Sequence, residues 1–493
     1  MLNFAHNLNF NIMTTEQLGY DKTSIASIFK YSQKLIGHSL RELVSEEEQQ
    51  ASNLQGQGKG GLGQMIEELF FHYPINSDPA PDFREAGMDL KATGLKKLIS
   101  GELQIKERLV CDLIDYEAVV NESFENSLFF IKCHIMLLIF YLYEKGVSKW
   151  DLRYIFTVVW QLPEKDLLII RNDFETIVNK IKKGQAHLIS EGDTVYLAAC
   201  RKGNIETKPR KQPFSDVLAP QRAFSLKAAY MRTVLEYIKQ QGKPAVTNME
   251  LPELSEGLVT TEELKSKSFE DIILDRFKPF YGMSYLDICK KLNVQPSKSK
   301  SRLAIIANKI AANGLQGLKD NSVDNSEEFQ KSGIRLKTVT SFSNGRVKEH
   351  TSFENIDYEE IYDEEEWLDS RLYELFTSRF LFVQFQQPEG EIQKDFDLDR
   401  LQLKRVFFWT MQPEDIDTAE EYWKNIRQHV LANEIDPKFF WSQGMHRKFH
   451  VRPKGRNAAD LAYNPNGGKV RKYCYWFNAE YVTSIIKKLS DNK

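Results

Sequence analysis

The stretch that decides the fold is residues 81–91, which read PDFREAGMDLK. Residues 88–92 alternate apolar and polar side chains, a pattern typical of a half-buried strand. Asp89 and Lys91 are two positions apart, so they face the same side of that strand. Asp82 follows a turn-forming Pro-Ala-Pro. If Asp82 ends the neighbouring strand, its carboxylate joins that of Asp89 around one metal ion, and Lys91 orients an attacking water.

Composition sets the limits within which this stretch is interpreted. The chain has 493 residues, of which 42% are hydrophobic and 27% charged, with a formal net charge of -3. These values predict two or three globular domains and exclude a protein that binds nucleic acid through its overall charge. The five cysteines are scattered, which indicates a reduced, cytoplasmic protein. We find no apolar stretch of membrane-spanning length, so we expect no membrane partner.

Outside this stretch, hydrophobic periodicity predicts alternating helices and strands. A glycine-rich loop at residues 56–63 precedes the first helix that bears on the site. The expected helices are residues 15–45, 64–71, 166–183 and 225–240, and the further expected strands are residues 135–142 and 194–199. Residues 241–269 are polar, contain Pro and Gly, and are expected to form a linker with one short helix.

The second half of the chain repeats the first. Residues 104–117, QIKERLVCDLIDYE, pair with residues 346–359, RVKEHTSFENIDYE. Residues 82–91 pair in the same way with residues 328–337, EFQKSGIRLK, at an offset that stays between 242 and 251 across the paired blocks. Several blocks in one order predict two copies of one fold. We therefore expect a catalytic domain at 1–240, a linker at 241–269 and a second domain at 270–493.

The second copy is an internal control for the first. It has Glu328, Arg335 and Lys337 at the positions that we pair with Asp82, Asp89 and Lys91. Because an arginine cannot bind a cation, the second copy is predicted to be catalytically inactive. The fold therefore does not require the acids of the first copy. This argues against the alternative interpretation of residues 82–91 as a solvated strand edge.

Two blocks carry a resemblance to a known family. Residues 61–71, GLGQMIEELFF, followed by PDFREAGMDLK, resemble the MutH mismatch-repair nicking endonuclease and the related type II restriction endonucleases that cut at GATC. The resemblance continues through residues 162–185 and 222–238, and it covers nearly all of residues 50–240. The two-copy layout is similar to that of the type IIE restriction enzymes rather than the single-domain repair protein.

This resemblance implies a fold and a chemistry. It implies an α/β (α+β) protein with two tandem PD-(D/E)xK, MutH-like domains, each a mixed sheet flanked by helices. It implies Mg2+ as cofactor and double-stranded DNA containing GATC as substrate. Glu67 matches the family's helix glutamate and would join Asp82 and Asp89 as a metal ligand, although Glu68 stays possible. Lys132 is the nearest candidate for a further catalytic lysine.

The resemblance also implies where DNA is read. The residues expected to contact DNA are Arg201, Lys202, Arg222, Ser225 and Lys227 in the first copy, and Arg452, Lys454, Arg456, Arg471 and Lys472 in the second. Ser225 and Lys227 are expected at the start of the last helix of the first copy. MutH has a tyrosine where this chain has Ser225, so we expect adenine methylation to block this enzyme only weakly.

Together these observations predict a type II restriction endonuclease that cuts both strands at GATC, with a second domain that binds another GATC site as an allosteric effector. The alternative within the same chemistry is a mismatch-repair-type nicking enzyme. The alternative of another class is a DNA-binding regulator that does not cut. We expect a monomer or a DNA-induced dimer, and a cognate DNA methyltransferase in the same system that forms no stable complex with this chain.

Overall fold

The computed structural model describes residues 18–51, 61–73, 80–98, 100–202, 208–249, 257–391 and 396–491. The chain divides into two compact units. The first comprises Met1–Leu167, Ile181–Gly184 and Arg201–Leu254, and the second comprises Leu168–Lys180, Gln185–Cys200 and Ser255–Lys493. No sequence pattern indicated that residues between 168 and 200 group with the second unit. The predicted domain boundaries stay a prediction.

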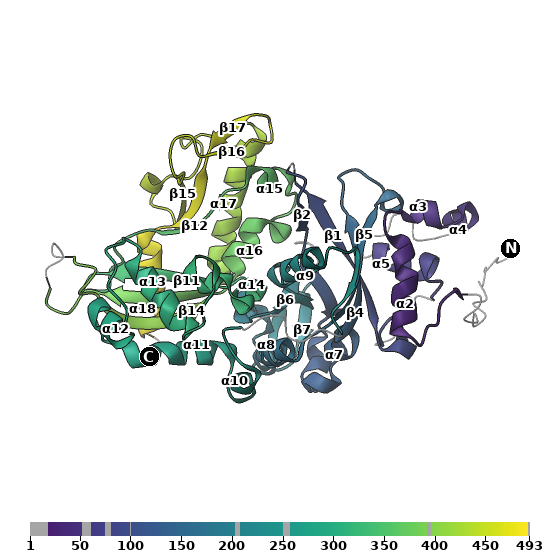
Figure 1. Ribbon diagram of the computed structural model, residues 1–493, viewed down its shortest axis with the longest axis horizontal. Coiled ribbons are helices and arrows are strands. Elements are labelled where there is room, and N and C mark those ends of the chain that lie inside the picture. Colours follow the sequence, from purple (N-terminus) through teal and green to yellow (C-terminus); the bar gives the residue numbers. More distant parts are fainter. Residues whose placement is uncertain are drawn as a thin grey trace. The chain divides into compact units, whose positions relative to one another are not determined.

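The first unit is built on a five-stranded mixed sheet in the order β10-β5-β4-β1-β2 (Figure 1). The central strand β4 (Ile135–Leu142) runs parallel to β1 (Asp89–Lys97) and antiparallel to β5 (Tyr154–Gln161). Residues 136–140 are buried, which confirms the strand predicted from this continuous apolar run. The edge strands are β2 (Leu103–Ile105) and β10 (Ala245–Thr247).

Short N-terminal helices pack with this sheet in one hydrophobic core. They are α2 (Ile25–Ser32), α3 (Leu40–Leu43) and α5 (Gly61–Met65), the last continued by a π-helical turn, Ile66–Phe70. The single helix expected within residues 15–45 is therefore broken into short pieces, and residues 15–17 of that prediction lie outside the described residues. Most of the glycine-rich loop, residues 56–60, lies outside them too.

The other elements of the first half follow in a fixed order. They are β3 (Leu109–Leu113), α6 (Tyr116–Val119), α7 (Leu128–Cys133), α8 (Glu164–Lys182), β6 (Leu197–Arg201), β7 (Arg210–Gln212), β8 (Ser215–Ala219), β9 (Arg222–Leu226) and α9 (Ala228–Gln241). Strand β9 pairs antiparallel with β3, so the helix expected at 225–240 begins only at Ala228. Strand β10 was also missed, because only three residues of the expected linker join the sheet.

The second half repeats this order, which confirms the predicted duplication. Its strands are β11 (Arg335–Ser341), β12 (Thr351–Asn355), β13 (Phe380–Gln386), β14 (Gln402–Trp409), β15 (Phe449–Pro453), β16 (Leu461–Tyr463), β17 (Lys469–Arg471) and β18 (Tyr473–Phe477). Strand β13 is again parallel to the first strand, β11, and antiparallel to the next, β14. The three strands β1, β4 and β5 of the first half therefore have the same order and directions as β11, β13 and β14 of the second.

The helices of the second half surround these sheets. They are α10 (Thr261–Ser266), α11 (Phe269–Phe277), α12 (Tyr285–Lys291), α13 (Arg302–Ala312), α14 (Glu327–Ser332), α15 (Tyr358–Asp363), α16 (Arg371–Thr377), α17 (Pro413–Leu431) and α18 (Ala479–Asp491). An aromatic-rich core joins residues of α16, α17, β13 and β18. In the part of the chain that the structure describes, we find no helix with the length and apolar character required to cross a membrane.

Candidate active site

The predicted catalytic residues of the first unit meet where β1 begins. The backbone N–H of Asp82 donates to Oδ1 of Asp89 at 3.1 Å, and the N–H of Leu90 donates to Oδ2 of Asp82 at 2.9 Å. The ammonium of Lys91 forms an ion pair with Oδ2 of Asp89. These contacts fix Asp82 beside the strand that carries Asp89 and Lys91, as the alternating sequence predicted.

Glu67 belongs to the same cluster. It lies on the π-helical turn Ile66–Phe70 and is only 7% exposed, whereas Glu68 is partly exposed. Burial, followed by repulsion from the carboxylates of Asp82 and Asp89, raises the pKa of Glu67 to about 8. The structure therefore brings Glu67 to the predicted site. The repulsion from Asp82 and Asp89 indicates that its carboxylate lies near both of theirs.

The electrostatics of the site show an excess of negative charge. Burial and the neighbouring Asp89 raise the pKa of Asp82 to about 6. Burial opposes the charging of Lys91, but Asp89 and Asp82 outweigh it and raise the pKa of that ammonium above its usual range. One charged lysine thus lies beside Asp89, next to two carboxyl groups, those of Glu67 and Asp82, whose ionisation is disfavoured.

This donor set fits a hard divalent cation in its chemistry. Carboxylate oxygens are the ligands such ions prefer, and a cation would offset both the burial and the repulsion that raise the pKa of Glu67 and Asp82. Among the described residues, however, no three His, Cys, Asp or Glu side chains are already arranged as a metal cage. Asp89 is instead neutralised by Lys91. Glu67, Asp82 and Asp89 are the residues that would hold the ion.

Lys132 has a different partner. Its ammonium, on α7, lies 3.3 Å from Oδ1 of Asp112 on β3. The second unit repeats this arrangement, since Arg371 on α16 binds both carboxylate oxygens of Glu354 on β12 at 2.6 and 2.9 Å. A cation on this helix therefore pairs with an acid on this strand in both copies. The catalytic role of Lys132 stays a prediction.

The first-copy residues expected to read DNA lie on several elements. Arg201 ends β6, and Lys202 follows it with its N–H donating to the carbonyl of Gln221 at 2.8 Å. Lys227 is the N-cap of α9, as expected. The placement of Ser225 at the start of that helix is wrong, because Arg222 and Ser225 both lie within β9 with buried side chains. Their roles in DNA reading stay predictions.

The basic residues of the second copy surround β15 and β17. The guanidinium of Arg452 lies 5.0 Å from the ring centroid of Trp476, and Lys454 donates to Oγ of Ser352 at 3.1 Å and to the carbonyl of Phe353 at 3.0 Å. Arg456 and Lys472 both pair with Asp460, at 3.2 and 2.6 Å. Arg471 ends β17 and is exposed.

The counterpart of the catalytic cluster in the second unit differs from the prediction. The N–H of Leu336 donates to Oδ1 of Asp324 at 2.9 Å, which is the bond that Leu90 makes to Asp82. Asp324, not Glu328, is therefore the structural equivalent of Asp82. The carboxylate of Glu328 instead accepts from the N–H groups of Leu258 and Val259 at 3.0 and 3.3 Å. The second copy has kept one of the acids.

Strand register identifies the other equivalents. In the first unit Asp89 on β1 pairs with Met136 on β4, which pairs with Trp160 on β5. In the second unit Arg335 on β11 pairs with Phe380 on β13, which pairs with Trp409 on β14. Arg335 thus replaces Asp89, and Lys337 matches Lys91. Helix α13 buries Leu303, Ile306, Ala307, Ile310 and Ala311 at the spacing of Leu62, Met65, Ile66, Leu69 and Phe70. That spacing puts Asn308 at the position of Glu67.

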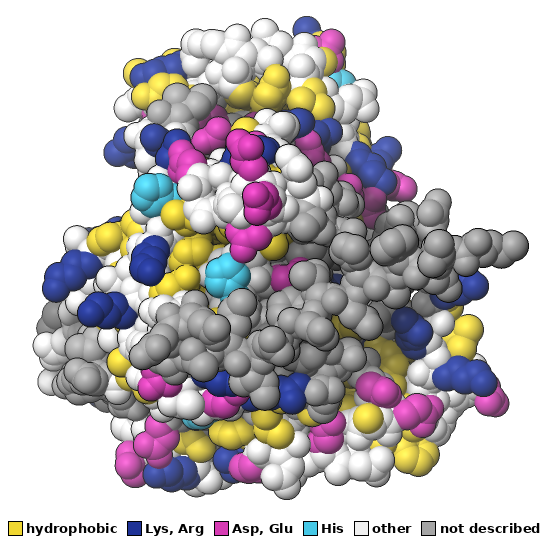
Figure 2. Space-filling view, turned by 90° about the vertical axis from the view of Figure 1, so that its right-hand side faces the viewer, with side chains coloured by type: hydrophobic (Ala, Val, Ile, Leu, Met, Phe, Trp, Pro, Cys, Tyr) yellow, Lys and Arg dark blue, Asp and Glu magenta, His cyan; other side chains and the backbone are white. Residues whose placement is uncertain are grey.

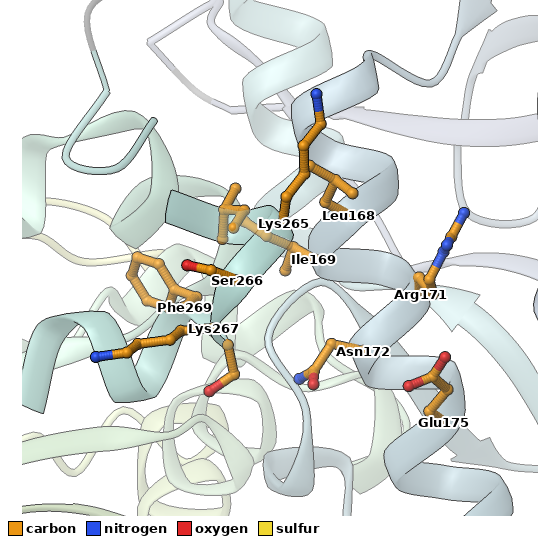
Figure 3. Close-up of a pocket in the computed structure, with 11 residues that line it drawn as sticks. Leu168, Ile169, Arg171, Asn172, Glu175, Lys265, Ser266, Lys267 and Phe269 are labelled. Carbon is orange, nitrogen blue, oxygen red and sulfur yellow. The ribbon is translucent and has the colours of Figure 1, made fainter. Parts of the chain in front are cut away.

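Two other surface features bear on the choice of site. A hollow of about 340 Å³ is lined by residues of α8 and the α10–α11 segment, including Arg171, Glu175, Lys265 and Lys267 (Figure 3). Its lining offers a single carboxylate, so it does not match the chemistry of the cluster around Asp89. Figure 2 shows acidic and basic side chains interspersed over the described part of one face.

Comparisons with known proteins agree with this geometry. Residues 71–173 match the family model described as DNA mismatch repair enzyme MutH. The chain is 33% identical to the type II restriction enzyme Sau3AI of Staphylococcus aureus over 451 residues, which cover 86% of this chain and 87% of that protein. It is 24% identical over 163 residues to the DNA mismatch repair protein MutH of Buchnera aphidicola subsp. Baizongia pistaciae, covering 33% of this chain and 73% of that protein. The chain therefore belongs to the MutH-like type II restriction endonucleases, a family of site-specific deoxyribonucleases.

Proposed function

We propose that this enzyme cuts both strands of DNA at GATC with Mg2+ as its cofactor. The observation that carries the proposal is the cluster at the start of β1, where Asp82, Asp89 and Glu67 meet one charged lysine. A divalent cation held there supplies Lewis-acid chemistry for phosphodiester hydrolysis. Lys91 is positioned by Asp89 to orient a water molecule or to stabilise developing negative charge.

The choice of GATC rests on resemblance. The similarity to Sau3AI extends over both halves of the chain, and the two-copy layout matches the GATC-cutting type IIE enzymes. A restriction enzyme acts as purified protein, whereas a repair nicking enzyme requires partner proteins. Incubation of the purified chain with a GATC plasmid and Mg2+ therefore separates the two. We expect linear product; a nicked circle that accumulates without linear product would favour the repair-type activity.

We further propose that the second unit binds a second GATC site and thereby activates the first. Its basic residue Arg452 lies on strand β15 and Lys454 directly follows that strand, while Arg335 stands where the first unit has Asp89, a proposed metal ligand. Plasmids with one and with two GATC sites test this role. We expect the two-site plasmid to be cut faster, and a GATC oligonucleotide to accelerate cutting of the one-site plasmid. Equal rates with no response to the oligonucleotide would contradict the effector role.

A further inference from the structure

The inactive site of the second unit has the opposite charge to the active one. In the first unit, three carboxyl groups, those of Glu67, Asp82 and Asp89, surround one ammonium. The equivalent positions of the second unit hold one amide, one carboxylate and two cations, namely Asn308, Asp324, Arg335 and Lys337. The backbone arrangement is the same, but a site suited to a cation has become one with surplus positive charge.

A third cation, Lys454, reaches this site from the end of β15. Lys337 donates to the carbonyl of Ser352 at 3.0 Å, and Lys454 donates to Oγ of the same residue at 3.1 Å. Burial, then repulsion from Arg335 and Lys454, lowers the pKa of Lys337, although Asp324 acts in the other direction. The positive charge of Lys337 is therefore disfavoured by burial and by repulsion from Arg335 and Lys454. An anion would relieve it.

Arg335 is available to bind such an anion. Its side chain is partly exposed, and its guanidinium donates one hydrogen bond, to the carbonyl of Ile334 at 3.2 Å. Among the described residues no carboxylate lies within ion-pair distance of Arg335, although its charge attracts those of Asp324 and Glu354, the latter already bound by Arg371. A guanidinium has five N–H donors, arranged to bind two oxygens of one phosphate. Asp324 instead holds the N–H of Leu336, so it does not neutralise Arg335 by contact.

We propose that this site binds a DNA phosphodiester without a metal ion, with Arg335 and Lys454 as its ligands and Lys337 behind them. The inference rests on the proposed DNA binding by the second unit. In this arrangement the guanidinium replaces the metal ion as the positive charge opposite the phosphate. Because the ligand set contains no acid that must first bind a cation, DNA binding by the second unit is independent of divalent metal.

The test measures the affinity of the full-length chain for a GATC duplex in EDTA. Under this condition no divalent cation neutralises the carboxylates of the first unit. We expect Arg335→Gln to weaken binding about tenfold or more, because it removes a charge-assisted bond to phosphate. Arg335→Lys keeps the charge but loses the paired donors, so it should weaken binding measurably, though less than Arg335→Gln. The wild type should bind more weakly to a duplex that carries one neutral methylphosphonate in the site. Arg335→Gln should be much less sensitive to that replacement, because the substitution and the methylphosphonate would remove the same contact.

The outcomes separate the inference from the function on which it rests. Suppose that the chain binds the duplex in EDTA, and that Arg452→Ala weakens this binding whereas Arg335→Gln does not. The second unit then binds DNA, but the proposed anion site is wrong. If the chain binds no duplex in EDTA, the metal-independent site is wrong. If, in addition, Arg452→Ala has no effect on binding in Ca2+, DNA binding by the second unit fails as well. Should Arg335→Gln unfold the chain, Arg335→Lys and the methylphosphonate duplex still decide.

Discussion

Both units have the same hydrogen bond, from a backbone N–H to an aspartate carboxylate, at the start of the equivalent strand. The side chains around that bond carry opposite charges in the two units. Leu90 binds Asp82 and Leu336 binds Asp324, yet Asp89 in one unit is Arg335 in the other. In the first unit burial, with added repulsion between carboxylates, raises the pKa of Glu67 and Asp82; in the second, burial, with added repulsion from Arg335 and Lys454, lowers the pKa of Lys337. The difference teaches that the sheet fixes positions, whereas the side chains decide whether a cation or an anion is bound.

The largest expected effect is the loss of cleavage in Asp89→Asn. The amide cannot supply a carboxylate to the metal ion, and Lys91 loses its ion-pair partner. We expect the single-turnover cleavage rate to fall by about four orders of magnitude, a size seen when a group essential to catalysis is removed. Asp151→Asn is the matched control, because Asp151 is a surface acid paired with Arg41 at 2.5 Å. A rate for Asp89→Asn close to that of the control would exclude Asp89 from the chemistry.

A second prediction converts one site toward the other. Arg335→Asp places a second carboxylate beside that of Asp324, as Asp89 lies beside Asp82. We expect DNA affinity in EDTA to fall about tenfold or more and to recover in part on addition of Ca2+, because a cation can now bridge acid and phosphate. Binding of GATC duplex by Arg335→Asp, titrated with and without Ca2+, measures this. Affinity equal to wild type in EDTA would show that residue 335 does not set the charge preference.

The third prediction concerns pH. The folded pKa of Glu67 is about 8, above its ordinary value of 4.5, so its protonated form stabilises the folded chain. This contribution is fully present below pH 4.5 and is lost as pH rises through 8. The wild type should therefore lose stability relative to Glu67→Gln, which cannot ionise, as pH rises from about 4.5 to about 8, with little further change above that. Denaturant midpoints of both proteins across this range measure the difference; parallel curves would mean that Glu67 is not held among acids.

The smallest expected effect concerns the ion pair that both units repeat. If Lys132 only joins α7 to β3, Lys132→Met and Asp112→Asn should each cost about 1 kcal/mol of stability and leave cleavage nearly unchanged. Arg371→Met in the second unit is the matched comparison, because it breaks the equivalent bond to Glu354. Urea midpoints and cleavage rates of the three variants decide. A loss of cleavage in Lys132→Met alone would support its predicted catalytic role.

Local patterns were enough to predict much of the site. Alternation at residues 88–92 placed Asp89 and Lys91 on one face, and the ordered repeat predicted two copies of one sheet. The pairing of Asp82 with Glu328 was wrong, because Arg335 comes eleven positions after Asp324, whereas Asp89 comes seven after Asp82. Helix α14 fills this longer connection, and a same-length alignment of the two segments cannot detect it.

Other errors came from contacts that are distant in sequence. Ser225 was expected on a helix, but its strand is defined by pairing with β3, more than a hundred residues earlier. The short strand β10 likewise exists only because β5 offers it an edge. The position of Asn308 could have been found from the spacing of apolar residues on α13, which matches that of residues 62–70.

On the proposals above, one position, Asp89 in the first unit and Arg335 in the second, decides which unit binds a metal ion. Calorimetric titration of the DNA-free full-length chain with Mg2+ or Mn2+ tests this most directly. We expect the titration to show one class of metal sites. Asp89→Asn should abolish metal binding at these sites, and Arg335→Gln should leave it unchanged. Metal binding that survives Asp89→Asn, or that Arg335→Gln removes, would contradict it.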